Sequence, residues 1–179
     1  MDIEKNPPLF DDLFESYRKT LGEDFEAYRN HCCRVFNFCC ALSGRASETR
    51  EPISIAAFFH DLGIWTDSTF DYLAPSVRHA REYLARTGRA AWQDEIEAMI
   101  EHHHKLRTYR LNQSWLVEPF RKADWIDVSM GMLRFKLSDD FVVDVLDAFP
   151  NAGYHNKLLR LVGERMKTHP FSPLPMVRF

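Results

Sequence analysis

The sharpest candidate for chemistry is the pair His60 and Asp61, which closes the apolar run ISIAAFF in the stretch AAFFHDLG. An ionised carboxylate without a counter-charge is so costly to bury that it takes up a proton instead, and a divalent cation would supply the missing charge. The alternative is a helix end at which Asp61 meets solvent or a nearby arginine. The pair alone therefore leaves both a metal site and an ordinary helix end open.

Other ligand-type residues also fall on the apolar sides of expected helices. On the helix expected over residues 24–43, a rotation of about 100° per residue places His31 toward the centre of the apolar stripe. On the helix expected over 114–129, Asp124 and Asp127 lie on or beside the buried side. Each acid could instead hold a backbone group or an arginine through hydrogen bonds.

Three consecutive histidines lie in the stretch IEHHHK, residues 100–105. The apolar positions of the helix expected over about 92–105 place His103 almost at the centre of the apolar stripe. His102 and His104 fall roughly 95° to 105° to either side. We therefore expect His103 to point inward, and at most one of its two neighbours to reach the same site.

The elements that must position these residues are helices. Apolar residues recur at spacings of three and four along nearly the whole chain, so the 179 residues predict one all-α domain of about six to eight helices. Start and stop signals place the helices at about 24–43, 52–62, 75–87, 92–105, 114–129, 139–149 and 154–168. The loop between the second and third contains IWTDSTFDYLAP, and the proline-rich tail HPFSPLPMVRF is expected to be extended.

The composition limits the partners. The formal net charge of -3 gives no general attraction to nucleic-acid phosphates. No apolar run approaches the roughly 18 residues that a membrane span needs, and the acidic start MDIEKNPPLFDD is unlike a signal peptide. We expect a cytoplasmic protein that binds neither bulk nucleic acid nor membranes, and a homodimer stays open. The four cysteines of HCCRVFNFCC are expected to be buried thiols.

The order His31, His60, Asp61, Asp124 resembles the HD superfamily of metal-dependent phosphohydrolases, named for its paired histidine and aspartate. The stretches RNHCCRV, AAFFHDLG and FRKADWIDVS are similar to the helices that carry this family's ligands. The resemblance covers about residues 24–130 and implies a single-domain helical bundle in which these four residues bind one divalent metal. Residues 1–23 would then form an arm or short helix, and residues 131–179 would form C-terminal helices and a tail packed on the same domain.

Many members of this family bind a second metal. By resemblance, SVRHAREYLARTG and MIEHHHK supply the candidate ligands His79, His103 and His104, with Asp61 as the bridge. Two imidazoles and two carboxylates leave open positions around an ion, which suits Mn²⁺, Fe²⁺, Mg²⁺ or Ni²⁺ better than a structural zinc. The sequence leaves the count at one ion or two.

The resemblance implies hydrolysis of a nucleotide or another small phosphate ester by a water molecule that the metal activates. Asp61, His79 and His103 are the candidate catalytic residues. Cationic side chains near the ligands in sequence are candidates for binding the phosphate oxygens. These are Arg78, Lys105, Arg121 and Lys122.

Two alternatives stay open. A few HD-fold proteins cleave a carbon bond with O₂ at two irons, and they use six ligands in the order His, His-Asp, His, His, Asp. The residues that fill those places here are His31, His60, Asp61, His79, His103 and Asp124. The other alternative is a non-catalytic sensing domain that a metal stabilises.

Overall fold

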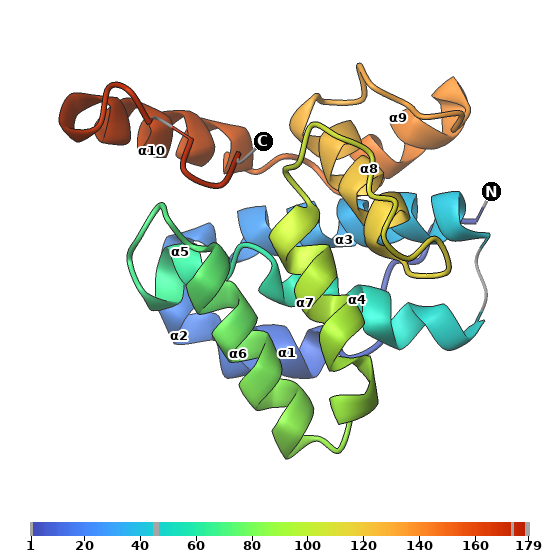
Figure 1. Cartoon of the computed structure of the whole chain (residues 1–179). Helices are drawn as coiled ribbons and strands as arrows, with labels where there is room; N and C mark the ends of the chain where they lie inside the picture. The colour runs from blue at the N-terminus through green and yellow to red at the C-terminus, as the bar shows by residue number, and fades with distance from the viewer. Residues whose placement is uncertain (1, 45–46, 173, 178–179) are drawn as a thin grey trace.

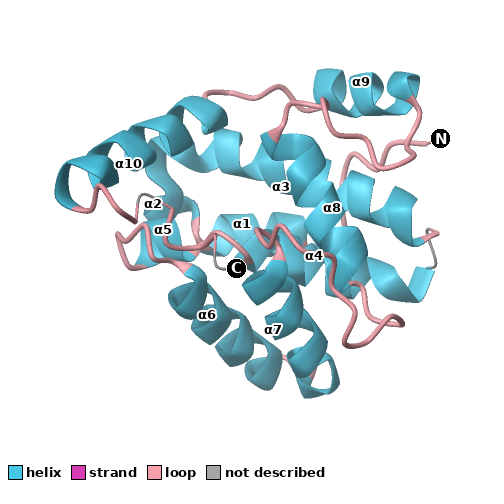
Figure 2. Ribbon diagram, turned by 45° about the horizontal axis from the view of Figure 1, so that its top comes forward, coloured by secondary structure: helices cyan, strands magenta, loops and turns pink. Residues whose placement is uncertain are grey.

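The computed structural model describes residues 2–44, 47–172 and 174–177, and within them it contains helices and loops but no strand (Figure 1, Figure 2). The α-helices are α1 (Phe10–Ser16), α2 (Arg18–Leu21), α3 (Phe25–Ser43), α4 (Arg50–Phe59), α5 (Gly63–Thr66), α6 (Leu73–Arg86), α7 (Gln93–His102), α8 (Val117–Val128), α9 (Asp139–Ala148) and α10 (Tyr154–Thr168). Short 3-10 helices precede α3, α4 and α7. The prediction of an all-α fold is confirmed.

The helices α4, α6 and α8 each carry a proline as their third residue, namely Pro52, Pro75 and Pro119. The first four amides of a helix have no acceptor within it, so a proline in the first turn loses no hydrogen bond, and its fixed φ suits the helix. The sequence places the starts of α4 and α6 at their prolines, two residues later than the structure does.

α4 is also shorter at its C-terminal end than the sequence predicts. The helix ends at Phe59, and His60 takes the C-cap position. The region expected to be a loop after it contains the one-turn helix α5, in which the Ile64 amide donates to the Asp61 carbonyl at 3.0 Å. Ile64 is buried, and its packing favours this extra turn. Asp61 therefore lies in a turn between two helices.

α3 is the central helix of the bundle and packs against α8, α4 and α9. Every residue from Asn30 to Cys40 is buried, and the four cysteines in this helix are free thiols, as expected. A helix that is buried on all sides offers its polar side chains no water. Each of them must therefore find a partner inside the protein.

The chain after α8 lies against this bundle. α9 packs on α3, and α10 extends from α3 toward one side of the molecule (Figure 1). The described part of the tail is not helical, and Met176 packs there against Ile64 and Tyr72. Among the described residues, no helix combines the length and the hydropathy needed to cross a membrane.

Candidate metal centre

A set of metal-ligand side chains converges in the middle of the bundle. His31 comes from α3, His60 and Asp61 from the turn after α4, His103 from the C-cap position of α7, and Asp124 from α8. Each of these residues is at most 2% exposed. Ligands that are distant in sequence are therefore held together by the packing of α3 between α4 and α8.

The first ligand group forms around His31 and His60, whose Nε2 atoms lie 2.9 Å apart. Asp61 Oδ2 lies 3.7 Å from the first nitrogen and 3.5 Å from the second. Asp124 Oδ1 lies 3.8 Å and 3.7 Å from the same two nitrogens. Ligand atoms about 2.1 Å from one ion lie roughly 3 Å apart, so a modest contraction would bring these four atoms into one coordination shell.

A second ligand group shares Asp61 with the first. His103 Nε2 lies 3.3 Å from Asp61 Oδ1, and Asp61, His103 and His104 offer ligand atoms within 4.8 Å of one another. His104 Nδ1 lies 3.3 Å from Asp124 Oδ2. Each of the two aspartates thus turns one oxygen toward the first group and the other oxygen toward the second.

The protonation of the imidazoles follows from their outer partners. Each of three Nδ1 atoms lies close to an oxygen: His31 Nδ1 is 2.6 Å from Asp127 Oδ2, His60 Nδ1 is 2.9 Å from Ala57 O, and His103 Nδ1 is 2.6 Å from Ile100 O. An oxygen in this position accepts, so Nδ1 carries the hydrogen and Nε2 keeps its lone pair. The two Nε2 lone pairs of the first group face each other, and a cation or a proton between them relieves the repulsion.

Several buried atoms of the centre have no hydrogen-bond partner within the described residues. They are Asp61 Oδ1, His103 Nε2 and both carboxylate oxygens of Asp124. A buried polar group without a partner costs about 1–3 kcal/mol, and more when it is charged. Two aspartates beside neutral imidazoles also leave about two uncompensated negative charges. The donor set therefore fits a divalent cation.

Without metal, a proton on His60 takes part of the cation's role. Burial lowers the pKa of His60, but the carboxylates of Asp61 and Asp124 outweigh it and raise that pKa to about 9. Burial would raise the pKa of either aspartate, but the neighbouring histidines, His60 first, hold both below the usual range. Burial lowers the pKa of His104, and the neighbouring His103 lowers it further, to about 4. His104 is therefore neutral at pH 7, as a metal ligand must be.

Asp127 and Arg34 form the layer behind His31. Arg34 is 1% exposed and donates to both oxygens of Asp127, with 3.0 Å between Nη2 and Oδ2, and it also donates to the Phe149 carbonyl at 2.8 Å. Burial alone would raise the pKa of Asp127, but the guanidinium and the hydrogen bond with His31 hold it below its usual range. Asp127 thus keeps its charge and fixes the imidazole.

Two buried tyrosines complete the centre. The Tyr72 hydroxyl lies 2.7 Å from His104 Nε2, and the Tyr154 hydroxyl donates to Asp61 Oδ2. Sequence reasoning missed Tyr154 and Arg34 as site residues. A signal existed for Arg34, because a charge inside the apolar run HCCRVFNFCC requires a buried counter-charge. Tyr154 carries no such signal.

The structure does not bring His79 to the other ligands. Its Nε2 lies 3.2 Å from Asp67 Oδ2 and its Nδ1 lies 4.0 Å from Glu82, at one side of α6. His102 packs against Tyr109, with 5.0 Å between the ring centroids. The roles of His79 as a ligand and catalytic residue stay predictions, and neither ligand group includes it.

The predicted phosphate-binding cations have different surroundings. Arg78 pairs with Asp67 at 2.7 Å. Arg121 donates to Glu118 at 2.8 Å, and Lys122 pairs with the same carboxylate at 3.3 Å.

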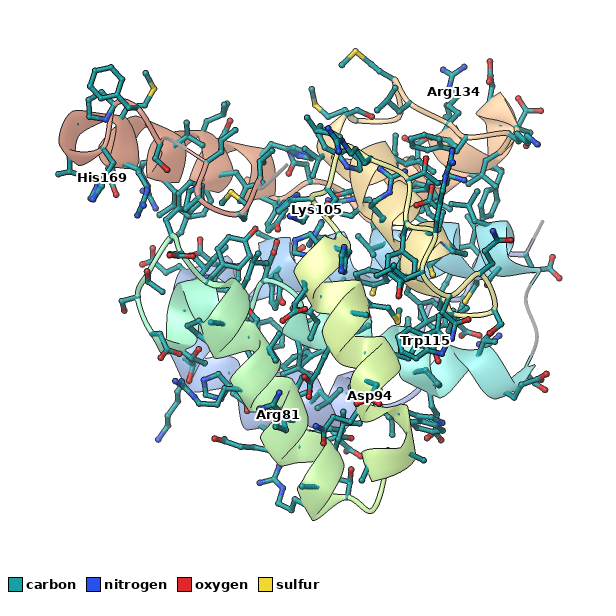
Figure 3. All side chains as sticks on the ribbon, viewed as in Figure 1. Arg81, Asp94, Lys105, Trp115, Arg134 and His169 are labelled. Carbon is teal, nitrogen blue, oxygen red and sulfur yellow. The ribbon has the colours of Figure 1, made fainter. Side chains whose placement is uncertain are left out.

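Lys105 lies just beyond the C-terminal end of α7, next to the turn that carries the ligand histidines (Figure 3). It lines a cavity of about 420 Å³ between α6 and α7. The other lining residues are Asp71, Leu73, Ala74, Glu101, His102 and Met176. Lys105 thus shares this cavity with His102, the residue before His103, whereas Lys122 lines another cavity of about 340 Å³.

The comparison with known families agrees with this geometry. The family model described as HD domain matches residues 28–129, more than half of the chain, and this range runs from α3 through α8 and includes both ligand groups. A search of curated proteins and a search of solved structures gave no match. The region after α8, which supplies Tyr154, lies outside the matched residues. The chain belongs to the HD domain family.

Proposed function

We propose that the protein is a metal-dependent phosphohydrolase that acts on a nucleotide or another small phosphate ester. The observation that carries the proposal is the set of buried ligand atoms of Asp61, His103 and Asp124 that have no hydrogen-bond partner among the described residues. A divalent ion at such a site lowers the pKa of a coordinated water molecule and polarises a phosphoryl oxygen. Mn²⁺, Fe²⁺, Mg²⁺ and Ni²⁺ suit these mixed nitrogen and oxygen ligands.

The proposed ligands of the first ion are His31, His60, Asp61 and Asp124. Asp61 turns its other oxygen toward His103, and this arrangement supports a second ion bound by Asp61, His103 and His104. His79 lies beside Asp67 instead, so we propose His104 in its place. Asp61 would then bridge the two ions and stand beside the reacting water.

The chain's own residues would prepare this site in two further ways. Asp127 holds the His31 imidazole in the tautomer that presents Nε2 to the ion. Lys105 adds a positive charge to the cavity of about 420 Å³, a size within the range of small-ligand pockets, beside the carboxylates of Asp71 and Glu101. We also propose that the protein is cytoplasmic and that it binds neither bulk nucleic acid nor membranes.

The oxidative alternative requires His79 among six ligands. The contact of His79 with Asp67 favours the hydrolytic proposal over the di-iron one. The sensing alternative would use the same ligands without turnover, so activity separates it from the proposal.

The test begins with metal-depleted protein, reloaded with Mn²⁺ and offered a panel of nucleoside mono-, di- and triphosphates. We expect phosphate release from at least one of them, its loss in Asp61→Asn, and its retention in the matched variant Asp67→Asn. A parallel sample reloaded with Fe²⁺ that holds two irons per chain, takes up oxygen and releases no phosphate would establish the oxidative alternative instead. Tight metal binding without either activity would point to the sensing domain.

A further inference from the structure

α10 is attached to the bundle in an unusual way. Of its fifteen residues, all of which the structure describes, Tyr154 is the one that is buried, at 1% exposure. The other residues of the helix are exposed or half-buried. A helix normally docks through a stripe of apolar side chains. Here the first residue enters the interior, while Leu158 and Leu161 of the same helix pack, partly buried, against Ile64, Tyr72 and Met176.

Tyr154 enters the interior at the metal centre. Its ring stacks on the His31 imidazole with 4.1 Å between centroids and 14° between planes. Its hydroxyl donates to Asp61 Oδ2, the oxygen that faces the first ligand group. One side chain from outside the matched HD domain residues therefore contacts two proposed ligands of the same ion.

The backbone around Tyr154 is fastened to the two helices that carry ligands. Asn30 on α3 donates to the Pro150 carbonyl at 2.9 Å. His155 Nε2 lies 3.0 Å from the Asp127 carbonyl of α8. Gly153, at φ 93°, takes the left-handed conformation that begins α10 and turns the next residue inward. These contacts fix the start of α10, and with it the Tyr154 hydroxyl, against α3 and α8.

The Tyr154 hydroxyl restricts the rotation of the Asp61 carboxylate. An aspartate carboxylate has no sharply preferred angle about its terminal bond, so a hydrogen bond is needed to fix its orientation. Asp61 Oδ1 has no hydrogen-bond partner among the described residues, although His103 Nε2 lies 3.3 Å away. The bond from Tyr154 to Oδ2 therefore selects the rotation in which one oxygen faces each ligand group. Without it, the carboxylate could turn and lose its alignment with both groups.

We propose that Tyr154 is a positioning residue of the metal centre, which holds Asp61 and His31 in their binding orientation and thereby couples the docking of α10 to metal binding. This inference rests on the proposed metal centre. An ordinary core tyrosine would also be buried and hydrogen-bonded, but it would have no effect on metal affinity. By reciprocity, if docked Tyr154 favours the bound metal, the bound metal favours docked α10.

The test compares Tyr154→Phe, which keeps the ring and removes the hydroxyl, with Tyr28→Phe as the matched control. Tyr28 is equally buried in the same aromatic group, but its hydroxyl donates to the Phe58 carbonyl at 2.6 Å. Mn²⁺ affinity is measured by calorimetry on metal-depleted protein, and hydrogen exchange of the α10 amides is followed with and without Mn²⁺. We expect the affinity to fall about 10- to 100-fold in Tyr154→Phe and to stay unchanged in Tyr28→Phe.

Exchange in α10 should slow on Mn²⁺ binding in the wild type and in Tyr28→Phe, and it should slow less in Tyr154→Phe. Asn30→Ala keeps Tyr154 but removes an anchor of the segment before it, so it should weaken Mn²⁺ binding by a smaller factor even where Tyr154→Phe folds poorly. Equal affinities and equal exchange in all variants would overturn the role of Tyr154 and leave the metal centre standing. A wild type that binds no Mn²⁺ would overturn the metal centre itself.

Discussion

Replacing Arg34 by methionine tests the layer that supports the metal centre. Arg34 and Asp127 are 1% and 0% exposed, and the change leaves the Asp127 carboxylate buried without its guanidinium. Breaking one partner of such a buried pair costs about 3–5 kcal/mol. In a chain of this size each kcal/mol lowers the melting temperature by about 2–4 °C, so we expect a decrease of roughly 6–20 °C.

The assays are thermal unfolding and urea unfolding of the metal-free protein at pH 7, with the melting temperature, the urea midpoint and the m-value compared between variants. Arg29→Met is the matched control, since Arg29 lies on the same helix and pairs with Asp11 at 3.0 Å, but Asp11 has an 80% exposed side chain. An exposed pair contributes about 0–1 kcal/mol. If Arg34→Met unfolds with the same midpoint as Arg29→Met, the buried pair does not stabilise the fold as argued.

A double variant separates stability from metal binding. Arg34→Met combined with Asp127→Leu removes both charges, which should restore most of the stability lost in the single variant. Its Mn²⁺ affinity should nevertheless stay about 10- to 100-fold below wild type, because His31 has lost the carboxylate that orients it. Wild-type affinity in the double variant would refute the positioning role of Asp127.

Further predictions use other features of the structure. Because the pKa of His60 is about 9 without metal, Mn²⁺ must displace its proton, so Mn²⁺ affinity in calorimetry should rise up to about tenfold per pH unit from pH 7 and level off near 9. Folding raises the pKa of His60, so its protonated form stabilises the folded state fully at a pH below the unfolded pKa of about 6.5. The free energy of unfolding of the metal-free protein in urea should therefore fall as the pH rises from about 6.5 to 9. Gly63→Ala would place a Cβ 2.6 Å from the Tyr72 carbonyl and should cost about 1–3 kcal/mol in urea unfolding, whereas Gly163→Ala, with nothing within 4 Å, should not destabilise. His79→Ala should leave the number of bound Mn²⁺ ions unchanged, and a lost ion would restore its predicted ligand role.

Local patterns were sufficient for the longer helices and for the ligands that lie on or next to them, but not for the one-turn helix α5. The apolar run before His60, and the buried side that carries Asp124, are properties of single helices, so periodicity and helix-end signals indicate them. The stripe on α3 predicted that His31 points inward, and it does. However, every residue from Asn30 to Cys40 is buried, so this stretch of α3 has no solvent-facing side. The apolar stripe therefore does not set His31 apart from the other residues of the stretch.

The remaining parts of the site depend on where helices end and which helices meet. A helical wheel extended to residue 105 allows at most one neighbour of His103 into the site, which the structure confirms, but the wheel alone does not say that this neighbour is His104. α7 ends at His102, so His103 and His104 follow in a turn and both reach the carboxylates. The contacts of Arg34 with Asp127 and of Tyr154 with Asp61 each join residues 93 positions apart. Such pairings arise from tertiary packing, which no local pattern reports.

The central claim is that these buried ligands bind divalent metal, and the most direct measurement is metal content per chain after depletion and equilibration with Mn²⁺. The account predicts at least one ion per chain in the wild type, a second if the group of His103 and His104 also binds, and none in a variant with Asp61→Asn and Asp124→Asn. A folded wild type that retains no ion, or a double variant that retains as many, would contradict it.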